Sequence, residues 1–138
     1  MKKRLALLAG LAAAALLAFH FLVPQQAVGK NAALYGVERN GIDITEKLSQ
    51  EQLNGLEALA ADAQCARWRN PMGAYPLRQD TVVLELWGES GRKDYPCRLY
   101  LVGSTDCYRA SWRSGEDYSL RKGEALLTQA LEIIGQTR

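Results

Sequence analysis

Few residues in this sequence are of the types that catalyse hydrolysis or group transfer. Its single histidine, His20, lies inside an apolar stretch near the N-terminus. Ser-His-Asp and Cys-His arrangements need a histidine as their base, so the rest of the chain lacks both. The pair Glu116-Asp117 is explained by a neighbouring turn. The "GESG" motif carries Glu89 where a nucleophile elbow has serine. We therefore predict that the protein is not an enzyme and has no catalytic, cofactor-binding or metal-binding residues.

Arginine and aromatic residues in the middle of the chain give a better indication of function. Trp, Tyr and Arg are the side chains most enriched at the energetic centres of protein–protein interfaces. They also stack on flat anionic or glycan ligands. Such pairs stabilise an exposed sheet by about 0.2–1 kcal/mol each without any partner, so a plain solvated surface is the competing interpretation. The candidate interaction face consists of Trp87, Arg98, Tyr100, Arg109 and Arg113.

Alternating strands separated by short turns must position these residues. A two-residue turn at 89–90 predicts an antiparallel pair in which Leu86 lies opposite Lys93. The same register sets Glu85 opposite Asp94, and this is the one carboxylate pair that would suit glycosidase-type chemistry. Nothing else in the sequence supports that chemistry.

A second two-residue turn at 104–105 predicts that Leu99 lies opposite Ala110, and the parity of side chains then divides the sheet into two faces. The core face is predicted to hold Val82, Leu84, Leu86, Tyr95, Cys97, Leu99, Leu101, Tyr108, Ala110 and Trp112. The second face is predicted to hold Thr81, Val83, Glu85, Trp87, Arg98, Tyr100, Val102, Cys107, Arg109, Ser111 and Arg113. An antiparallel sheet commonly leaves one face in water, and we expect this second face to be the solvated one.

Two amphipathic helices flank the strands. The first, over 49–64, starts with a capping box in which Ser49 and Gln52 bond reciprocally, and the second covers 124–136. Before them, Asn40-Gly41 suits a type I′ hairpin turn. The predicted fold is α+β: one antiparallel meander of three to five strands with both helices on one face. We expect residues 1–23 to be a membrane segment, 24–33 a linker and 34–138 the folded domain.

Three cysteines permit at most one internal disulfide. Cys97 and Cys107 are predicted to lie on opposite faces, or about 13 Å apart if the turn is longer, so we expect no bridge between them. Cys65 reaches Cys97 only if the first helix ends early.

The apolar run Leu5–Val23 contains no formal charge and is about 30 Å long as a helix, which matches one hydrocarbon core. Lys2, Lys3 and Arg4 precede it, which predicts a cytoplasmic N-terminus and an extracytoplasmic domain. Near the outer end of this run, His20 is expected to be tolerated by the interface. The alternative is a secreted protein cleaved near Gly29, after small residues.

Charge limits the class of partner. The three basic residues before the apolar run account for the positive balance, because the remaining 14 Lys and Arg face 15 Asp and Glu. A near-neutral domain outside the cell argues against nucleic acid as a partner.

The order of a membrane segment, a short strand, "NG", "IDITEKLSQEQLNGL" and a meander ending in "YRASW" resembles small membrane-tethered extracytoplasmic proteins of Gram-positive bacteria. The resemblance implies an extracytoplasmic α+β module over residues 34–134 and supplies no catalytic residues. We expect a single-pass membrane protein whose domain binds an envelope protein in a regulatory or scaffolding role. The alternative is a small-ligand sensor or carrier with a pocket between a helix and the sheet.

Overall fold

A computed structural model describes residues 1–69, 80–90, 93–102, 109–111 and 117–135. The helices are α1 (Lys2–Leu22), α2 (Gln50–Asp62) and α3 (Gly123–Gly135), with a short 3-10 helix, η1 (Thr45–Lys47). The strands are β1 (Gln25–Gln26), β2 (Lys30–Arg39), β3 (Ile42–Asp43), β4 (Gln64–Arg69), β5 (Val82–Ser90), β6 (Lys93–Leu101), β7 (Arg109–Ser111) and β8 (Asp117–Leu120).

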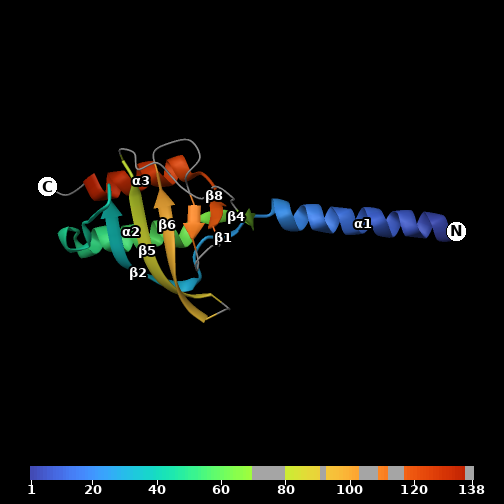
Figure 1. Cartoon of the computed structure of the whole chain (residues 1–138), viewed down its shortest axis with the longest axis horizontal. Coiled ribbons are helices and arrows are strands. Elements are labelled where there is room, and N and C mark those ends of the chain that lie inside the picture. Colours follow the sequence, from blue (N-terminus) through green and yellow to red (C-terminus); the bar gives the residue numbers. More distant parts are fainter. Residues whose placement is uncertain (70–79, 91–92, 103–108, 112–116, 136–138) are drawn as a thin grey trace.

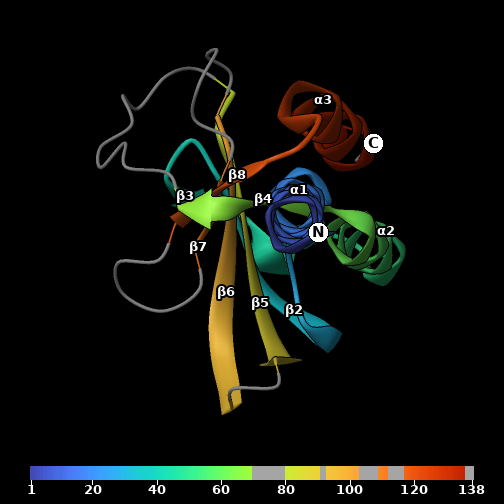
Figure 2. The same cartoon turned by 90° about the vertical axis from the view of Figure 1, so that its right-hand side faces the viewer.

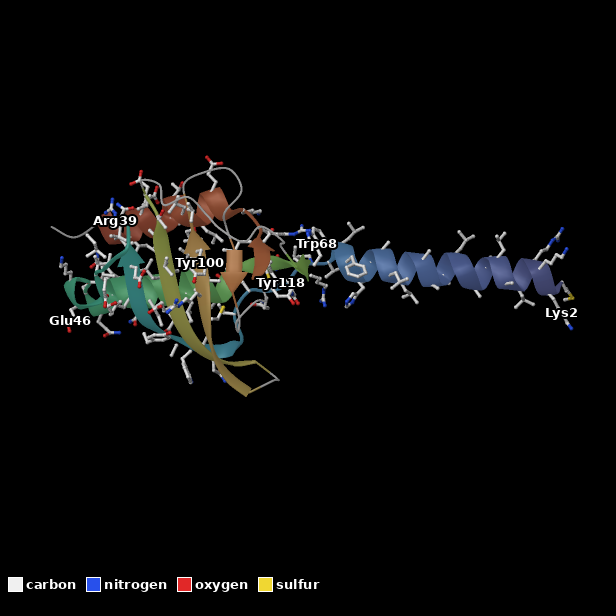
Figure 3. All side chains as sticks on the ribbon, viewed as in Figure 1. Lys2, Arg39, Glu46, Trp68, Tyr100 and Tyr118 are labelled. Carbon is white, nitrogen blue, oxygen red and sulfur yellow. The ribbon has the colours of Figure 1, made fainter. Side chains whose placement is uncertain are left out.

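The helix α1 extends away from the rest of the chain, as Figure 1 shows. It is long and apolar enough to cross a membrane, and none of its residues is buried against the domain. Its first residue, Lys2, lies at the end farthest from the domain (Figure 3). The sequence-based prediction of an N-terminal apolar helix is therefore confirmed.

The strands form one antiparallel sheet in the order β1-β4-β8-β7-β6-β5-β2-β3. The α+β class and the antiparallel meander are confirmed, since β5, β6, β7 and β8 follow one another along the chain and across the sheet. The sheet is wider than the three to five strands expected. The additional width comes from β2 beside β5, β4 beside β8, and the short edge strands β1 and β3.

The register between β5 and β6 differs from the prediction. Leu86 lies opposite Cys97 instead of Lys93, and Ser90 pairs with Lys93, so the strands continue two residues beyond the expected turn. The predicted turn at 89–90 was therefore wrong. The shift is an even number of residues, and an even shift leaves every side chain on its own face. Between β6 and β7, the predicted pairing of Leu99 with Ala110 is confirmed, while the turn at 104–105 lies outside the described residues.

Both α2 and α3 pack on the same side of the sheet, as Figure 2 shows. Leu56 of α2 and Leu127 of α3 are buried with Leu84 and Leu99 of the two central strands. The core-face prediction is confirmed for Val82, Leu84, Leu86, Cys97, Leu99 and Leu101, which are all buried. Tyr108 and Trp112 lie outside the described residues, and the side chains of Tyr95 and Ala110 are not described.

Local sequence signals account for the two best-predicted details. Asn40 and Gly41 both have positive φ angles, of 52° and 78°, as a type I′ turn between β2 and β3 requires. At the start of α2, the Ser49 hydroxyl accepts from the Gln52 amide, and the Gln52 side chain accepts from the Ser49 amide. The predicted capping box is therefore present.

The segment expected to be a linker, residues 24–33, belongs to the folded domain. Gln25 pairs with Cys65 in the β1–β4 ladder, and β2 already begins at residue 30. Ala27 and Val28 lie in the hydrophobic core, and the Ala27 amide donates to the Ala63 carbonyl over 2.9 Å. Pro, Gln and Asn in this stretch suggested a linker, but the small apolar residues between them fill space under the sheet.

The outer edge of β2 is covered by side chains. The Glu57 carboxylate of α2 accepts from the Leu34 amide at 2.8 Å, and the Thr45 hydroxyl accepts from the Val37 amide at 2.9 Å. An edge strand with open amides can pair with a strand of another chain. Because two of its outward amides are already bonded, this edge is poorly suited to strand addition.

Candidate interaction face

The strands β2, β5 and β6 bring four aromatic and basic side chains together on the sheet face opposite α2 and α3. Tyr35 comes from β2, Trp87 from β5, and Arg98 and Tyr100 from β6. The rings of Tyr35 and Trp87 are 6.5 Å apart in an edge-to-face arrangement, and the two residues remain 47% and 51% exposed. Tyr100 lies in the middle of the sheet, as Figure 3 shows. Exposed, mutually packed aromatic rings of this kind are suited to contact a partner.

A carboxylate under this cluster holds the arginine in place. Glu85 lies opposite Arg98 in the β5–β6 ladder, and its Oε1 is 2.7 Å from Arg98 Nη2. The Glu85 side chain is only 15% exposed, whereas that of Arg98 is 52% exposed. The pair therefore anchors the base of the guanidinium and leaves part of it facing solvent.

A glycine on the neighbouring strand provides the room for this carboxylate. Gly36 of β2 pairs with Glu85, and a Cβ built on Gly36 would lie 2.6 Å from Glu85 Oε2. Any larger residue at this position would displace the carboxylate. The absence of a side chain at Gly36 thus positions Glu85 and, through it, Arg98.

Neighbouring groups in the cluster shift the pKa values of Tyr35 and Arg98. Burial raises the pKa of Tyr35, and the neighbouring Glu85 carboxylate raises it further, so the phenol stays neutral. A hydrogen bond with Tyr100 raises the pKa of Arg98, with Glu85 adding to the effect. The cluster consequently offers a partner a charged guanidinium, that of Arg98, close to the neutral phenol of Tyr35.

The predicted second face is only partly open to solvent. Thr81, Val83 and Val102 belong to it by parity, yet all three are buried. The expectation that the whole face is solvated was therefore wrong: among the side chains of this face that the structure describes, those of Trp87 and Arg98 are the exposed ones. Arg109 pairs with Tyr100 in the β6–β7 ladder. Its side chain is not described, and Cys107 and Arg113 lie outside the described residues.

The sequence patterns did not predict that Tyr35 and Gly36 belong to this site, nor that Glu85 and Arg98 form an ion pair. The alternation in "LYGVER" predicts a strand, but no local signal places that strand beside β5. Glu85 was expected opposite Asp94, and the shifted register sets it opposite Arg98 instead. The carboxylate pair considered for glycosidase chemistry is therefore not formed.

Other sites with the potential for chemistry are limited in the described part of the chain. The Cys65 thiol is free and buried, and burial raises its pKa to about 11, so it is poorly reactive. It points to the Gln26 carbonyl at 4.0 Å, while the Cys97 thiol donates to the Ala27 carbonyl at 3.4 Å. The described residues contain no group of three or more His, Cys, Asp or Glu that could hold a metal ion.

A hollow of about 260 Å³ lies where α2 ends and α3 begins. It is lined by Asp62, Ala63, Gln64, Arg121, Lys122, Ala125, Leu126 and Gln129. Closer to the centre of the domain, the helix–sheet contact is filled by buried leucines.

The sequence matches no protein-family model, and neither the curated proteins nor the solved structures give a match to this chain. Any functional assignment consequently rests on the geometry of the site.

Proposed function

We propose that this protein is a membrane-tethered extracytoplasmic interaction module, which binds an envelope protein through the surface formed by Tyr35, Trp87 and Arg98. The observation that carries the proposal is the half-exposed Tyr35–Trp87 ring pair beside the anchored Arg98 guanidinium. Tyr, Trp and Arg dominate the energetic centres of interfaces because they bury large areas and still form directed polar contacts.

The tether is α1, and the fold favours an uncleaved anchor over a removed signal peptide. Cleavage near Gly29 would remove β1 together with Ala27 and Val28, which are buried in the core. A domain that loses part of its core and one edge strand would be destabilised. The three basic residues before the apolar run favour a cytoplasmic N-terminus, which sets the domain outside.

The arrangement favours an interaction module over a ligand carrier. A carrier would need a pocket between a helix and the sheet, whereas Leu56, Leu84 and Leu127 are buried against one another at that interface. The hollow of about 260 Å³ lies at the margin of the domain, between the end of α2 and the start of α3.

Site-specific photocrosslinking in native membranes tests this proposal. A photoreactive amino acid replaces Trp87 in one variant and the exposed Asn54, on helix α2, in the control. We expect a discrete crosslinked product from position 87 only, and we expect it to be lost when Arg98→Ala is added. Identical products from both positions, or a product at position 87 that survives Arg98→Ala, would contradict the proposal.

A further inference from the structure

The end of the membrane helix is held by two arginines of the domain. Arg67 of β4 donates from Nε to the Val23 carbonyl at 2.9 Å, and Arg121 donates from Nη2 to the Leu22 carbonyl at 3.2 Å. The last carbonyls of a helix have no partner within the helix, and cations are favourable there because the helix dipole is negative at that end. The two arginines therefore fix the domain to the end of α1.

The connection between α1 and the sheet is too short to let the domain move away from the end of the helix. Pro24 alone separates Val23 from β1, whose Gln25 pairs with Cys65 and donates from its side chain to the Ala66 carbonyl at 3.1 Å. Two residues span at most about 7 Å. If α1 crosses the membrane, β4 and the start of α3 must lie at the level of the lipid headgroups.

The side chains at this level are of the kinds that headgroups bind. We define the juxtamembrane rim as Arg67, Trp68, Arg121 and Lys122. Trp68 is 48% exposed and lies next to the end of α1 in Figure 3, while Arg121 and Lys122 are exposed. Tryptophan is enriched at membrane–water interfaces, where its ring is apolar and its N–H finds polar partners.

Within the described part of the chain, the acidic residues near the rim do not cancel its charge. Asp62 shares the hollow with Arg121 and Lys122, and Arg67 adds a third cation on the neighbouring strand. Glu124 follows in the first turn of α3. Counted over the residues that the structure describes, the rim thus carries three cations against two carboxylates, and its two arginines donate to the carbonyls at the end of α1.

We propose that the juxtamembrane rim binds anionic phospholipid headgroups of the outer leaflet of the membrane that α1 spans. Binding there holds the domain against the bilayer in one orientation. The face around Trp87 then lies at a fixed angle to the membrane surface. The inference rests on the proposed tether, because a chain without α1 in a membrane would not bring the rim to the headgroups.

The test uses the full chain in lipid nanodiscs, with Trp87→Phe and Trp112→Phe so that Trp68 is the single tryptophan. Fluorescence quenching by lipids brominated near the headgroup measures the contact, in phosphatidylcholine alone and in mixtures with phosphatidylglycerol. Lys122→Asn removes one charge and keeps the positive φ of 51°, which asparagine tolerates. Lys47→Asn, in η1, makes the same change at another exposed lysine.

We expect stronger quenching of Trp68 in the anionic mixture. A basic residue near an anionic surface strengthens binding about fivefold. Lys122→Asn should therefore weaken the binding of the rim to anionic headgroups by roughly that factor. The control Lys47→Asn should change nothing. Equal quenching in both lipids, or equal effects of the two lysine variants, would overturn the rim while leaving the tether intact. A chain that fails to enter nanodiscs at all would overturn the tether and the rim together.

Discussion

Gly36 lies directly opposite Glu85, and the missing side chain of the glycine is the space that the Glu85 carboxylate occupies. The glycine in β2 thereby sets the position of Glu85 in β5 and, through the ion pair, of Arg98 in β6, two places away in the sheet. The position of Arg98 in the candidate interaction face therefore depends on this relation.

Replacing this glycine should disturb the cluster. Gly36→Ala forces a methyl group against Glu85 Oε2 and lies close to its Cβ, at 3.3 Å. Overpacking of this kind costs about 1–3 kcal/mol, so we expect a fall of that size in the free energy of unfolding. Denaturant titration measures it, and an unchanged midpoint would show that the carboxylate moves aside without cost.

The same substitution in α2 provides the matched control. A Cβ at Gly55 would meet Ile133 at 3.6 Å, an ordinary contact, and alanine favours helices over glycine by up to about 1 kcal/mol. Gly55→Ala should therefore stabilise the domain. A loss of stability there would mean that α2 and α3 pack more tightly than the structure shows.

Gln52 joins the two helices and should be sensitive to a change of one atom. Its Nε2 donates to the Ile133 carbonyl at 2.8 Å, while its Oε1 completes the capping box with Ser49. Gln52→Glu keeps the acceptor but loses the donor at the C-terminal end of α3. We expect the free energy of unfolding, measured by thermal denaturation, to fall by about 1–3 kcal/mol, because the partly buried Ile133 carbonyl loses its donor.

The exposed Gln50, two residues earlier in α2, is the control for this charge change. Gln50→Glu adds the same carboxylate at the N-terminus of α2, where a negative charge is favourable, and should alter stability by no more than about 0.5 kcal/mol. Equal losses for the two variants would indicate that the charge, and not the bond to Ile133, determines the effect.

Alanine substitutions at core and at surface positions of neighbouring strands should differ sharply in their effect on the free energy of unfolding. Leu84→Ala and Leu99→Ala remove buried side chains and should each cost about 2–5 kcal/mol. Trp87→Ala, at a half-exposed position, should alter the free energy of unfolding by no more than about 0.5 kcal/mol. A loss at Trp87 as large as that at Leu84 would mean that this face is structural.

The buried thiol of Cys65 predicts a loss of stability at alkaline pH. Its pKa is raised from 9.0 to about 11 by burial, so between those values the unfolded chain releases a proton that the folded chain retains. Stability contributed by this group is complete below pH 9 and is lost as the pH rises toward 11. Cys65→Ala should flatten this part of the stability curve; an unchanged slope would contradict the assignment.

Sequence patterns predicted the features that depend on neighbouring residues. The Asn40-Gly41 turn, the Ser49 capping box and the division of β5 and β6 into two faces follow from local conformation and side-chain parity. Parity was preserved even though the β5–β6 register was wrong, because the error was an even number of residues.

Features that depend on distant pairing were not predictable from these patterns. β4 was interpreted as the end of a helix and a turn, because "QCARWR" alternates too briefly to compete with the helical pattern before it. Residues 25–28 resembled a linker, since their burial arises from contacts with β4 and with Ala63. The contribution of Tyr35 and Gly36 to the face likewise required the nonlocal β2–β5 pairing.

We predict that α1 remains attached to the domain and that the domain lies outside the membrane. Intact-mass analysis of the protein extracted from right-side-out membrane vesicles, before and after treatment with an external protease, tests it most directly. We expect a chain that retains residues 2–22 before treatment, and a domain that the external protease digests. A mature chain beginning at Lys30, or a domain protected inside the vesicles, would contradict it.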